Sequence, residues 1–152
     1  MGAYLIGPGL ILFVALFWAD TALALEPSNE SSDPLNAIYY EKISLLKSLI
    51  HDDQKLKDLQ IGDLKLTLPY MAILMHSPRA LQALIQQGVD FNQANIFGVT
   101  PLHLAAYHND AEACRILMRA GARLTMLNRL GQTPLALAKE KGSAECLHAM
   151  TN

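Results

Sequence analysis

The stretch Thr100-Pro101-Leu102-His103-Leu104-Ala105-Ala106 decides the fold, because a related stretch, Thr133-Pro134-Leu135-Ala136-Leu137-Ala138, follows it at a step of 33. A third threonine, Thr67, precedes Thr100 by the same step. Glycines keep this step in two further pairs: Gly88 with Gly121, and Gly98 with Gly131. A period of this length is typical of proteins in which small helical units stack on one another.

The residue types in the repeated stretch suit the start of a helix. A threonine hydroxyl can cap the helix N-terminus, and a proline at the first helical position fixes the backbone without wasting an amide donor. The two alanines allow a neighbouring helix to approach closely. Gly88 and Gly121 are predicted to end helices where the backbone turns left-handed.

The stretch at Thr100 resembles the T-P-L-H-x-A signature of the ankyrin-repeat family, and Gly88-Val89-Asp90-Phe91-Asn92 resembles the family's G-A-D-V-N loop. This resemblance implies an all-α solenoid of stacked helix-turn-helix units with β-turn fingers. It also implies that His103 is structural, since the family's histidine hydrogen-bonds to the threonine and across repeats. The residues of the structural motif are Thr67, Gly88, Thr100, Pro101, His103, Gly121, Thr133 and Pro134.

The 33-residue frame predicts four units: a degenerate N-terminal repeat at 34–61, repeats at 62–94 and 95–127, and a C-terminal capping repeat at 128–152. In the first unit, apolar residues at steps of three and four predict one amphipathic helix from Pro34 to Ile50. A short charged helix is expected at 55–60. The repeat at 62–94 departs from the signature, with Leu68 in place of the proline and Tyr70 in place of the histidine.

The N-terminus carries an uninterrupted apolar run at residues 10–19, followed by Ala22-Leu23-Ala24. Small residues at these positions suit signal peptidase, so residues 1–24 are predicted to be a cleaved signal peptide and residues 25–33 a flexible leader. The expected localisation is periplasmic or secreted. The alternative is a retained membrane anchor, because residues 3–19 are apolar apart from glycines and Pro8. This run is slightly shorter than the roughly 20 residues that span a bilayer. The segment before residue 10 lacks the Lys or Arg typical of a signal peptide.

The charges argue against a nucleic-acid partner. The chain has 12 Lys and Arg against 14 Asp and Glu, and these are scattered along the sequence, whereas phosphate binding needs a concentrated basic stripe. The membrane is an expected partner only if the N-terminal segment is retained.

Cys114 and Cys146 must be considered for pairing if the protein is exported. In the 33-residue frame Cys146 is one residue out of register with Cys114. Axes of neighbouring helices lie about 8–10 Å apart, whereas a disulfide requires Cα atoms within about 7 Å. The frame therefore predicts two buried free thiols.

No pattern in the sequence indicates catalysis. His103 and His108 are the closest pair among five histidines, but a spacing of five places them on different faces of a helix, and no carboxylate or cysteine completes a zinc site with them. The nucleophile elbow, the glycine-rich phosphate loop and the H-E-x-x-H motif are all missing from the sequence. We expect no enzyme, no metal site and no cofactor.

The resemblance places partner binding on the finger tips and the exposed side of each first helix, where this sequence is unusually apolar. Large exposed apolar patches mark interaction sites, and Phe97 and Tyr107 are the expected anchors. Alternatively, Phe97, Leu127 and Leu130 fold back and cover the finger bases, or pack against the N-terminal segment. The predicted partner-binding residues are Leu64, Leu66, Leu74, Met75, Ile96, Phe97, Val99, Tyr107, His108, Leu127, Arg129, Leu130, Gln132, Glu140 and Lys141.

The sequence thus predicts a non-catalytic protein-binding scaffold whose concave face of fingers and first helices acts in the periplasm or outside the cell. Protecting or assisting a periplasmic enzyme is one role by analogy with exported proteins of this kind. The alternatives are an immunity protein that neutralises a secreted toxin, and a membrane-anchored adaptor.

Overall fold

The computed structural model describes residues 33–151. The predicted signal peptide and most of the predicted leader lie outside the described residues. Among the described helices, none combines the length and the apolar character that a membrane crossing requires.

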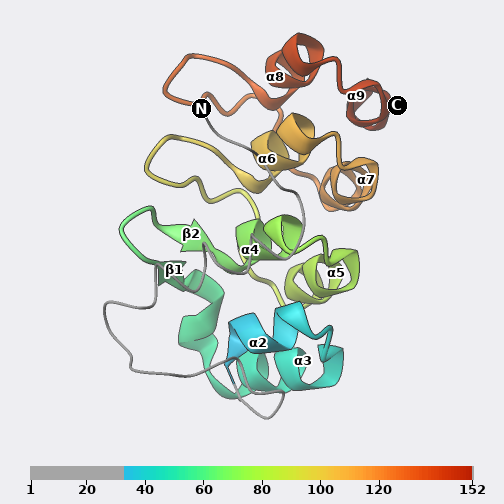
Figure 1. The fold of residues 1–152 in the computed structure, drawn as a ribbon. Coiled ribbons are helices and arrows are strands. Elements are labelled where there is room, and N and C mark those ends of the chain that lie inside the picture. The colour runs from blue at the N-terminus through green and yellow to red at the C-terminus, as the bar shows by residue number, and fades with distance from the viewer. Residues whose placement is uncertain (1–32, 152) are drawn as a thin grey trace, which may run out of the picture. The chain divides into compact units, whose positions relative to one another are not determined.

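The described chain forms helix pairs joined by extended fingers (Figure 1). The pairs are α2 (Pro34–Tyr39) with α3 (Ile43–Asp52), α4 (Leu68–Leu74) with α5 (Pro78–Gln86), α6 (Pro101–His108) with α7 (Ala111–Arg119), and α8 (Pro134–Lys141) with α9 (Ala144–Thr151). A 3-10 helix, Gln54–Asp58, leads into the first finger, where β1 (Gln60–Ile61) pairs antiparallel with β2 (Leu66–Thr67).

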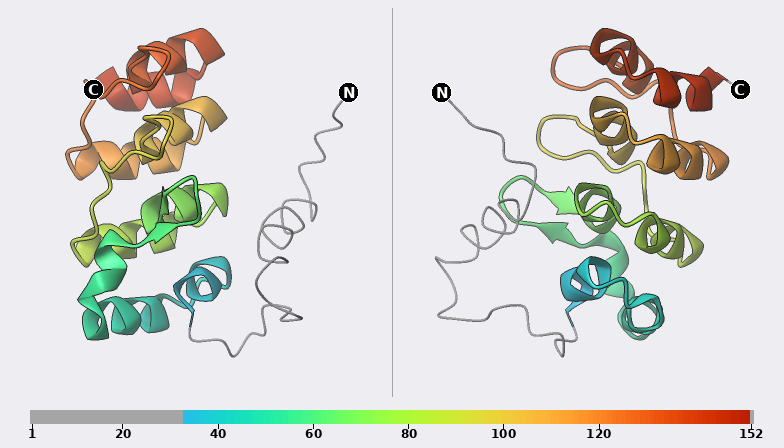
Figure 2. Two further views of the ribbon diagram at one scale, coloured as in Figure 1. Left: turned by 90° about the vertical axis from the view of Figure 1, so that its left-hand side faces the viewer. Right: turned by 45° about the vertical axis from the view of Figure 1, so that its right-hand side comes forward.

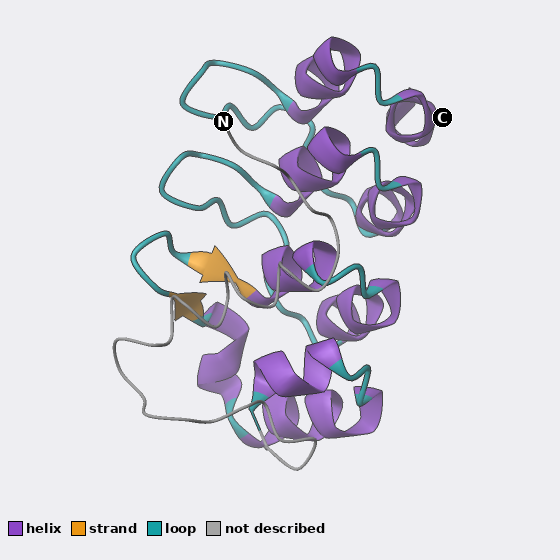
Figure 3. Cartoon of the chain, viewed as in Figure 1, coloured by secondary structure: helices purple, strands orange, loops and turns teal. Residues whose placement is uncertain are grey.

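The helices stack in two columns, with the fingers projecting from one side (Figure 3). The first helices α2, α4, α6 and α8 pack in succession, and so do the second helices α3, α5, α7 and α9. This arrangement confirms the predicted all-α repeat solenoid.

Threonine caps begin the first helix in three of the four pairs. The hydroxyl oxygens of Thr67, Thr100 and Thr133 accept hydrogen bonds from backbone amides three residues later, at 3.4, 3.3 and 3.1 Å. Each helix then packs through small or aliphatic residues, and Ala105 and Ala106 of α6 are fully buried. Larger side chains at these two positions would push α6 away from its neighbours.

The prediction of a single helix from Pro34 to Ile50 is wrong. The chain turns at Glu41, which has a left-handed φ of +50°, and α2 and α3 form the first helix pair. The amides of Glu41 and Lys42 close the turn onto carbonyls of α2, at 3.2 and 2.9 Å. Tyr39 and Ile43 are four residues apart, so the apolar spacing continues across the turn and conceals it.

The expected charged helix at 55–60 is also corrected. The chain forms the short 3-10 helix at Gln54–Asp58 and then enters β1. It therefore leads into the first finger and does not act as the second helix of the N-terminal unit.

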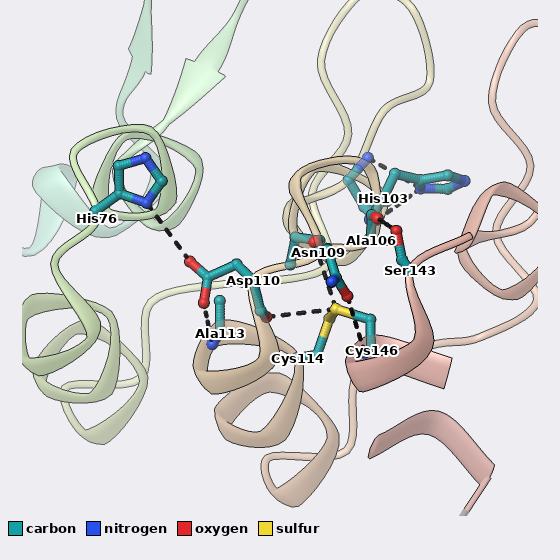
Figure 4. Close-up of a disulfide and its surroundings, with 11 residues drawn as sticks. His76, His103, Ala106, Asn109, Asp110, Ala113, Cys114, Ser143 and Cys146 are labelled. Carbon is teal, nitrogen blue, oxygen red and sulfur yellow. Dashed lines mark hydrogen bonds and ion pairs between the residues drawn. A yellow bond between two sulfur atoms is a disulfide. The ribbon is translucent and has the colours of Figure 1, made fainter. Parts of the chain in front are cut away.

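The prediction of two free thiols is wrong as well, because Cys114 and Cys146 form a disulfide between α7 and α9 (Figure 4). Their Cα atoms are 5.5 Å apart. Helical Cα atoms lie about 2.3 Å from the axis, so facing residues come much closer than the axes do. The offset of one residue is compatible with pairing because side chains of packed helices interdigitate.

Candidate binding groove

A groove of about 450 Å³ runs along the first helices of the last three units and the bases of the neighbouring fingers. Its wall on the helix side comes from α4, α6 and α8. The lining residues are Tyr70, Leu74, Val99, His103, Leu104, Tyr107, His108, Asn128, Leu130, Gln132, Leu137, Glu140 and Lys141.

Asparagine side chains hold the two later fingers in the same conformation. The side-chain oxygen of Asn95 accepts hydrogen bonds from the amides of Phe97 and Val99, at 2.9 and 3.0 Å. Asn128, at the equivalent position of the next repeat, does the same for Leu130 and Gln132, at 3.0 and 2.9 Å. The finger side chains therefore project from a defined backbone, which limits the entropy lost on binding a partner.

Adjacent fingers are joined by backbone hydrogen bonds. The amide of Ile96 donates to the carbonyl of Leu64 at 3.2 Å, and the amide of Arg129 donates to that of Phe97 at 2.9 Å. The Arg129 guanidinium also lies over the Phe97 ring, 5.7 Å from its centre. Each finger thus positions the next along the groove.

His103 is fully buried and links two units. Its Nε2 lies 3.0 Å from the carbonyl oxygen of Gln132, while its Nδ1 lies 3.2 Å from the Thr100 amide and 2.9 Å from the Thr100 hydroxyl. A neutral ring with hydrogen on Nε2 satisfies every partner. Burial lowers the pKa of His103, against a smaller opposing effect of the Gln132 carbonyl, so the ring serves packing and offers no free nitrogen.

The ends of the first helices carry exposed rings and charges. Tyr107 is 55% exposed, and the Lys141 ammonium lies 5.1 Å from its ring centre. Glu140 contacts the side-chain amide of Gln132 and lies 3.6 Å from the Lys141 ammonium. This edge of the groove combines an aromatic surface with a cation held above it.

Beside Tyr107, the His108 ring lies 6.5 Å from the ring of His76. His76 Nδ1 is 4.0 Å from a carboxylate oxygen of Asp110. Burial lowers the pKa of His108, and His76 acts in the same direction, while Asp110 opposes them. Within residues 33–151, no cluster of three or more His, Cys, Asp or Glu side chains is arranged to hold a metal ion.

The structure brings together about half of the predicted partner-binding residues. Those that line the groove are Leu74, Val99, Tyr107, His108, Leu130, Gln132, Glu140 and Lys141. Those that lie outside its lining are Leu64, Leu66, Met75, Ile96, Phe97, Leu127 and Arg129. Folding back over the finger bases does not describe Phe97, Leu127 or Leu130, which are 46%, 59% and 82% exposed.

The predicted partner-binding set lacks five lining residues, of which His103 was expected to be structural: Tyr70, His103, Leu104, Asn128 and Leu137. The repeat frame could have found them, because Leu104 and Leu137 are separated by one repeat period, as are Tyr70 and His103. The predicted set is confined to the helix ends and finger tips, whereas these residues lie between them.

The family model for ankyrin repeats (3 copies) matches residues 35–126 and 68–152. The chain is similar to the ankyrin repeat domain of Bcl-3, a member of the IkappaB protein family, with a TM-score of 0.70 and 22% sequence identity. The alignment covers 78% of this chain and 50% of that one, so the chain spans half the length of this structure. No curated protein matches the sequence.

Proposed function

The chain belongs to the ankyrin-repeat family, whose repeats generally bind other proteins, and we propose that it is a non-catalytic scaffold that holds a protein partner in the groove along α4, α6 and α8. The observation that carries this proposal is the exposure of large apolar side chains at one site. Tyr107 and Leu130 line the groove and are 55% and 82% exposed. Such side chains gain most when a partner covers them.

We also propose that the protein works outside the cytoplasm. The apolar run at residues 10–19, with Ala22-Leu23-Ala24 behind it, supports export. The disulfide between Cys114 and Cys146 supports it independently, because disulfides persist in oxidising compartments. A periplasmic or secreted location would place the partner there.

Two biological roles fit this location equally. The protein could protect or assist a periplasmic enzyme, or it could act as an immunity protein that neutralises a secreted toxin. A third role, that of a membrane-anchored adaptor, requires that the N-terminal segment is retained. Identifying the partner separates the first two roles, and N-terminal sequencing of the native protein tests the third by finding Met1 or Leu25.

The groove is tested by quantitative affinity capture with three forms of the oxidised protein. The wild type is compared with a groove variant, Tyr107→Ala/Leu130→Ala, and with a control variant, Glu112→Ala/Arg115→Ala. Glu112 and Arg115 form an exposed ion pair on α7 at 2.7 Å, away from the groove lining. A partner that the groove variant loses and the control retains supports the proposal. Equal capture by both variants contradicts it.

With a partner in hand, the anchors are measured directly. Phe97→Ala/Tyr107→Ala is expected to weaken binding by more than about tenfold, as is common for exposed aromatic anchors. The fold should be unaffected because both side chains are about half exposed. Isothermal titration calorimetry gives the affinity and circular dichroism the helix content. Unchanged affinity would remove these two rings from the binding surface.

A further inference from the structure

All four helix pairs contain the same turn. The left-handed residue is Glu41, His76, Asn109 or Gly142, with φ between +50° and +67°. In each turn its amide bonds to a carbonyl three residues back, and the next amide bonds five residues back. Glu41 is therefore equivalent to His76, although the step between them is 35, whereas the later steps are 33.

This equivalence defines a first-helix ridge, made of the two residues before each left-handed position. The ridge residues are Tyr39 and Tyr40, Leu74 and Met75, Tyr107 and His108, and Glu140 and Lys141. Tyr39 and Tyr40 are 43% and 40% exposed, and their ring centres are 4.9 Å apart. The 33-residue frame hid this pair because the first step is two residues longer.

Contacts between neighbouring turns make the ridge continuous. The Ser77 hydroxyl donates to a carboxylate oxygen of Glu41 at 3.1 Å, which joins the first two units. His76 approaches Asp110 in the third unit (Figure 4), and the Ser143 hydroxyl donates to the carbonyl of Ala106 at 2.6 Å. The ends of α2, α4, α6 and α8 therefore follow one another along the stack (Figure 2).

A lysine lies at each end of the ridge: Lys42 follows the first left-handed residue, Glu41, and Lys141 is itself a ridge residue. The Lys42 ammonium lies 5.6 Å from the centre of the Tyr40 ring, and the Lys141 ammonium lies 5.1 Å from that of Tyr107. Glu140 is the one carboxylate among the ridge residues, and it is engaged by Gln132 and Lys141. The middle of the ridge is formed by aliphatic, thioether, phenol and imidazole groups.

The usual spacing of packed helices matches one extended conformation. Packed helix axes lie about 8–10 Å apart, and a polyproline II helix advances about 9 Å in each three-residue turn. Every third side chain of such a segment would meet the ridge in successive units. Exposed aromatic rings are also the surface on which polyproline II segments bind.

We propose that the first-helix ridge binds a polyproline II segment of the protein partner, about ten residues long, with proline or aliphatic residues at every third position and carboxylates at both ends. The acidic ends would meet Lys42 and Lys141, because complementary charges fix the register of a bound segment. The inference rests on the proposed protein-binding function and extends its surface from the groove to α2.

The test is fluorescence anisotropy with the full oxidised chain and three labelled peptides of about ten residues. The probe has a proline-rich centre and aspartates at both ends. One control replaces the prolines with glycine, and the other replaces the aspartates with lysine. Both controls are expected to bind at least about tenfold more weakly than the probe. Equal binding of the glycine peptide overturns the polyproline II conformation, and equal binding of the lysine peptide overturns the charge match.

Variants locate the peptide on the ridge. Tyr39→Ala and Lys42→Glu are expected to weaken probe binding by about tenfold. Lys139→Glu is the matched control, because this exposed lysine of α8 lies outside the ridge. Circular dichroism checks that the helix content is unchanged. If Tyr39→Ala and Lys42→Glu bind like the control, the ridge is not the site.

Leu130→Ala separates this inference from the proposed function, because Leu130 lines the groove and lies outside the ridge. A partner that depends on Leu130, while Tyr39→Ala changes neither partner nor probe binding, supports the groove and overturns the ridge. Probe binding that depends on Tyr39, while no partner depends on Leu130, supports the ridge and overturns the groove.

Discussion

At the scale of single residues, two glycines at the same place in consecutive fingers have different surroundings. Gly98 and Gly131 both have φ of +73°. A Cβ at Gly98 would lie 3.0 Å from the Cα of Asn128 and 3.0 Å from the carbonyl oxygen of Leu127, whereas a Cβ at Gly131 would have nothing within 4 Å. Gly98 therefore serves both the turn and the contact with the next finger.

Gly98→Ala is expected to lower the free energy of unfolding more than Gly131→Ala. The left-handed conformation costs a non-glycine residue about 1–2 kcal/mol at either position. Overpacking against the next finger adds about 1–3 kcal/mol at Gly98 alone. Urea unfolding of both variants measures the difference. Equal losses would show that the neighbouring finger yields to the methyl group.

The buried His103 is expected to make the free energy of unfolding depend on pH. Burial lowers its pKa in the folded state, below the ordinary value of about 6.5 that applies to the unfolded chain. Between these two pKa values the unfolded chain binds a proton that the folded chain does not. The contribution of His103 to the free energy of unfolding is therefore complete above about pH 6.5, and it declines as the pH falls from there towards the folded pKa. His108 contributes in the same direction, because burial lowers its pKa too.

The free energy of unfolding is therefore expected to decrease between about pH 7 and pH 5. His103→Gln should be less stable at pH 7, because the bonds that join Thr100 to Gln132 are disturbed. It should also depend less steeply on pH in that range. Urea unfolding at several pH values gives both quantities. An unchanged pH slope in the variant would mean that another group causes the decrease.

At the scale of secondary-structure elements, local chemistry was readable from the sequence and long-range geometry was not. The threonine caps and the prolines behind them mark where α6 and α8 begin. The turn at Glu41 gave no such signal, since it has neither glycine nor proline and the apolar spacing runs through it. The distance between Cys114 and Cys146 depends on how α7 and α9 pack, which the repeat frame alone cannot supply.

The disulfide predicts a large loss of stability when it is removed. It closes a loop with a sequence separation of 32, and in the chain-entropy view such a loop restricts the unfolded chain by roughly 3–4 kcal/mol. Cys114→Ala/Cys146→Ala should lower the free energy of unfolding by about 3 kcal/mol. Reductant should destabilise the wild type by a similar amount and leave the variant unchanged.

Alkylation checks the bond itself. The denatured wild type should add no label before reduction and two labels after it, because both cysteines are in the bond. Labelling of both cysteines without reductant would restore the original prediction of free thiols.

At the scale of the whole described domain, the repeat frame located part of the groove and stopped where the period changed. Tyr107 and Leu130 were found because each is at a fixed offset from a threonine cap. Tyr39 was missed because the step from its unit to the next is longer than the period and its helix has no threonine cap. A repeat that diverges in length can therefore keep its place in a surface while it disappears from the sequence pattern.

The last unit is expected to stabilise the whole stack. α8 packs on α6, and α9 packs on α7. The last unit contacts three fully buried residues of α6 and α7. Cys146 contacts Ala105 and is bonded to Cys114, and Ser143 contacts Ala106. Each repeat buries its apolar face only against its neighbours, so the last unit covers faces of α6 and α7 that would otherwise meet water. Without it three helix pairs would remain, which is about the minimum for a stable stack, and they would lack their C-terminal cap.

A chain that ends before Thr133 should therefore lose its cooperative thermal transition, measured by circular dichroism in the far ultraviolet. It would expose the faces of α6 and α7 and could not form the disulfide. The full-length Cys114→Ala/Cys146→Ala variant is the control, because it lacks the bond but keeps α8 and α9. It should melt cooperatively at a lower temperature than the wild type. A cooperative melt of the shortened chain would mean that α6 and α7 close the stack by themselves, so the last unit would serve the groove and not the fold.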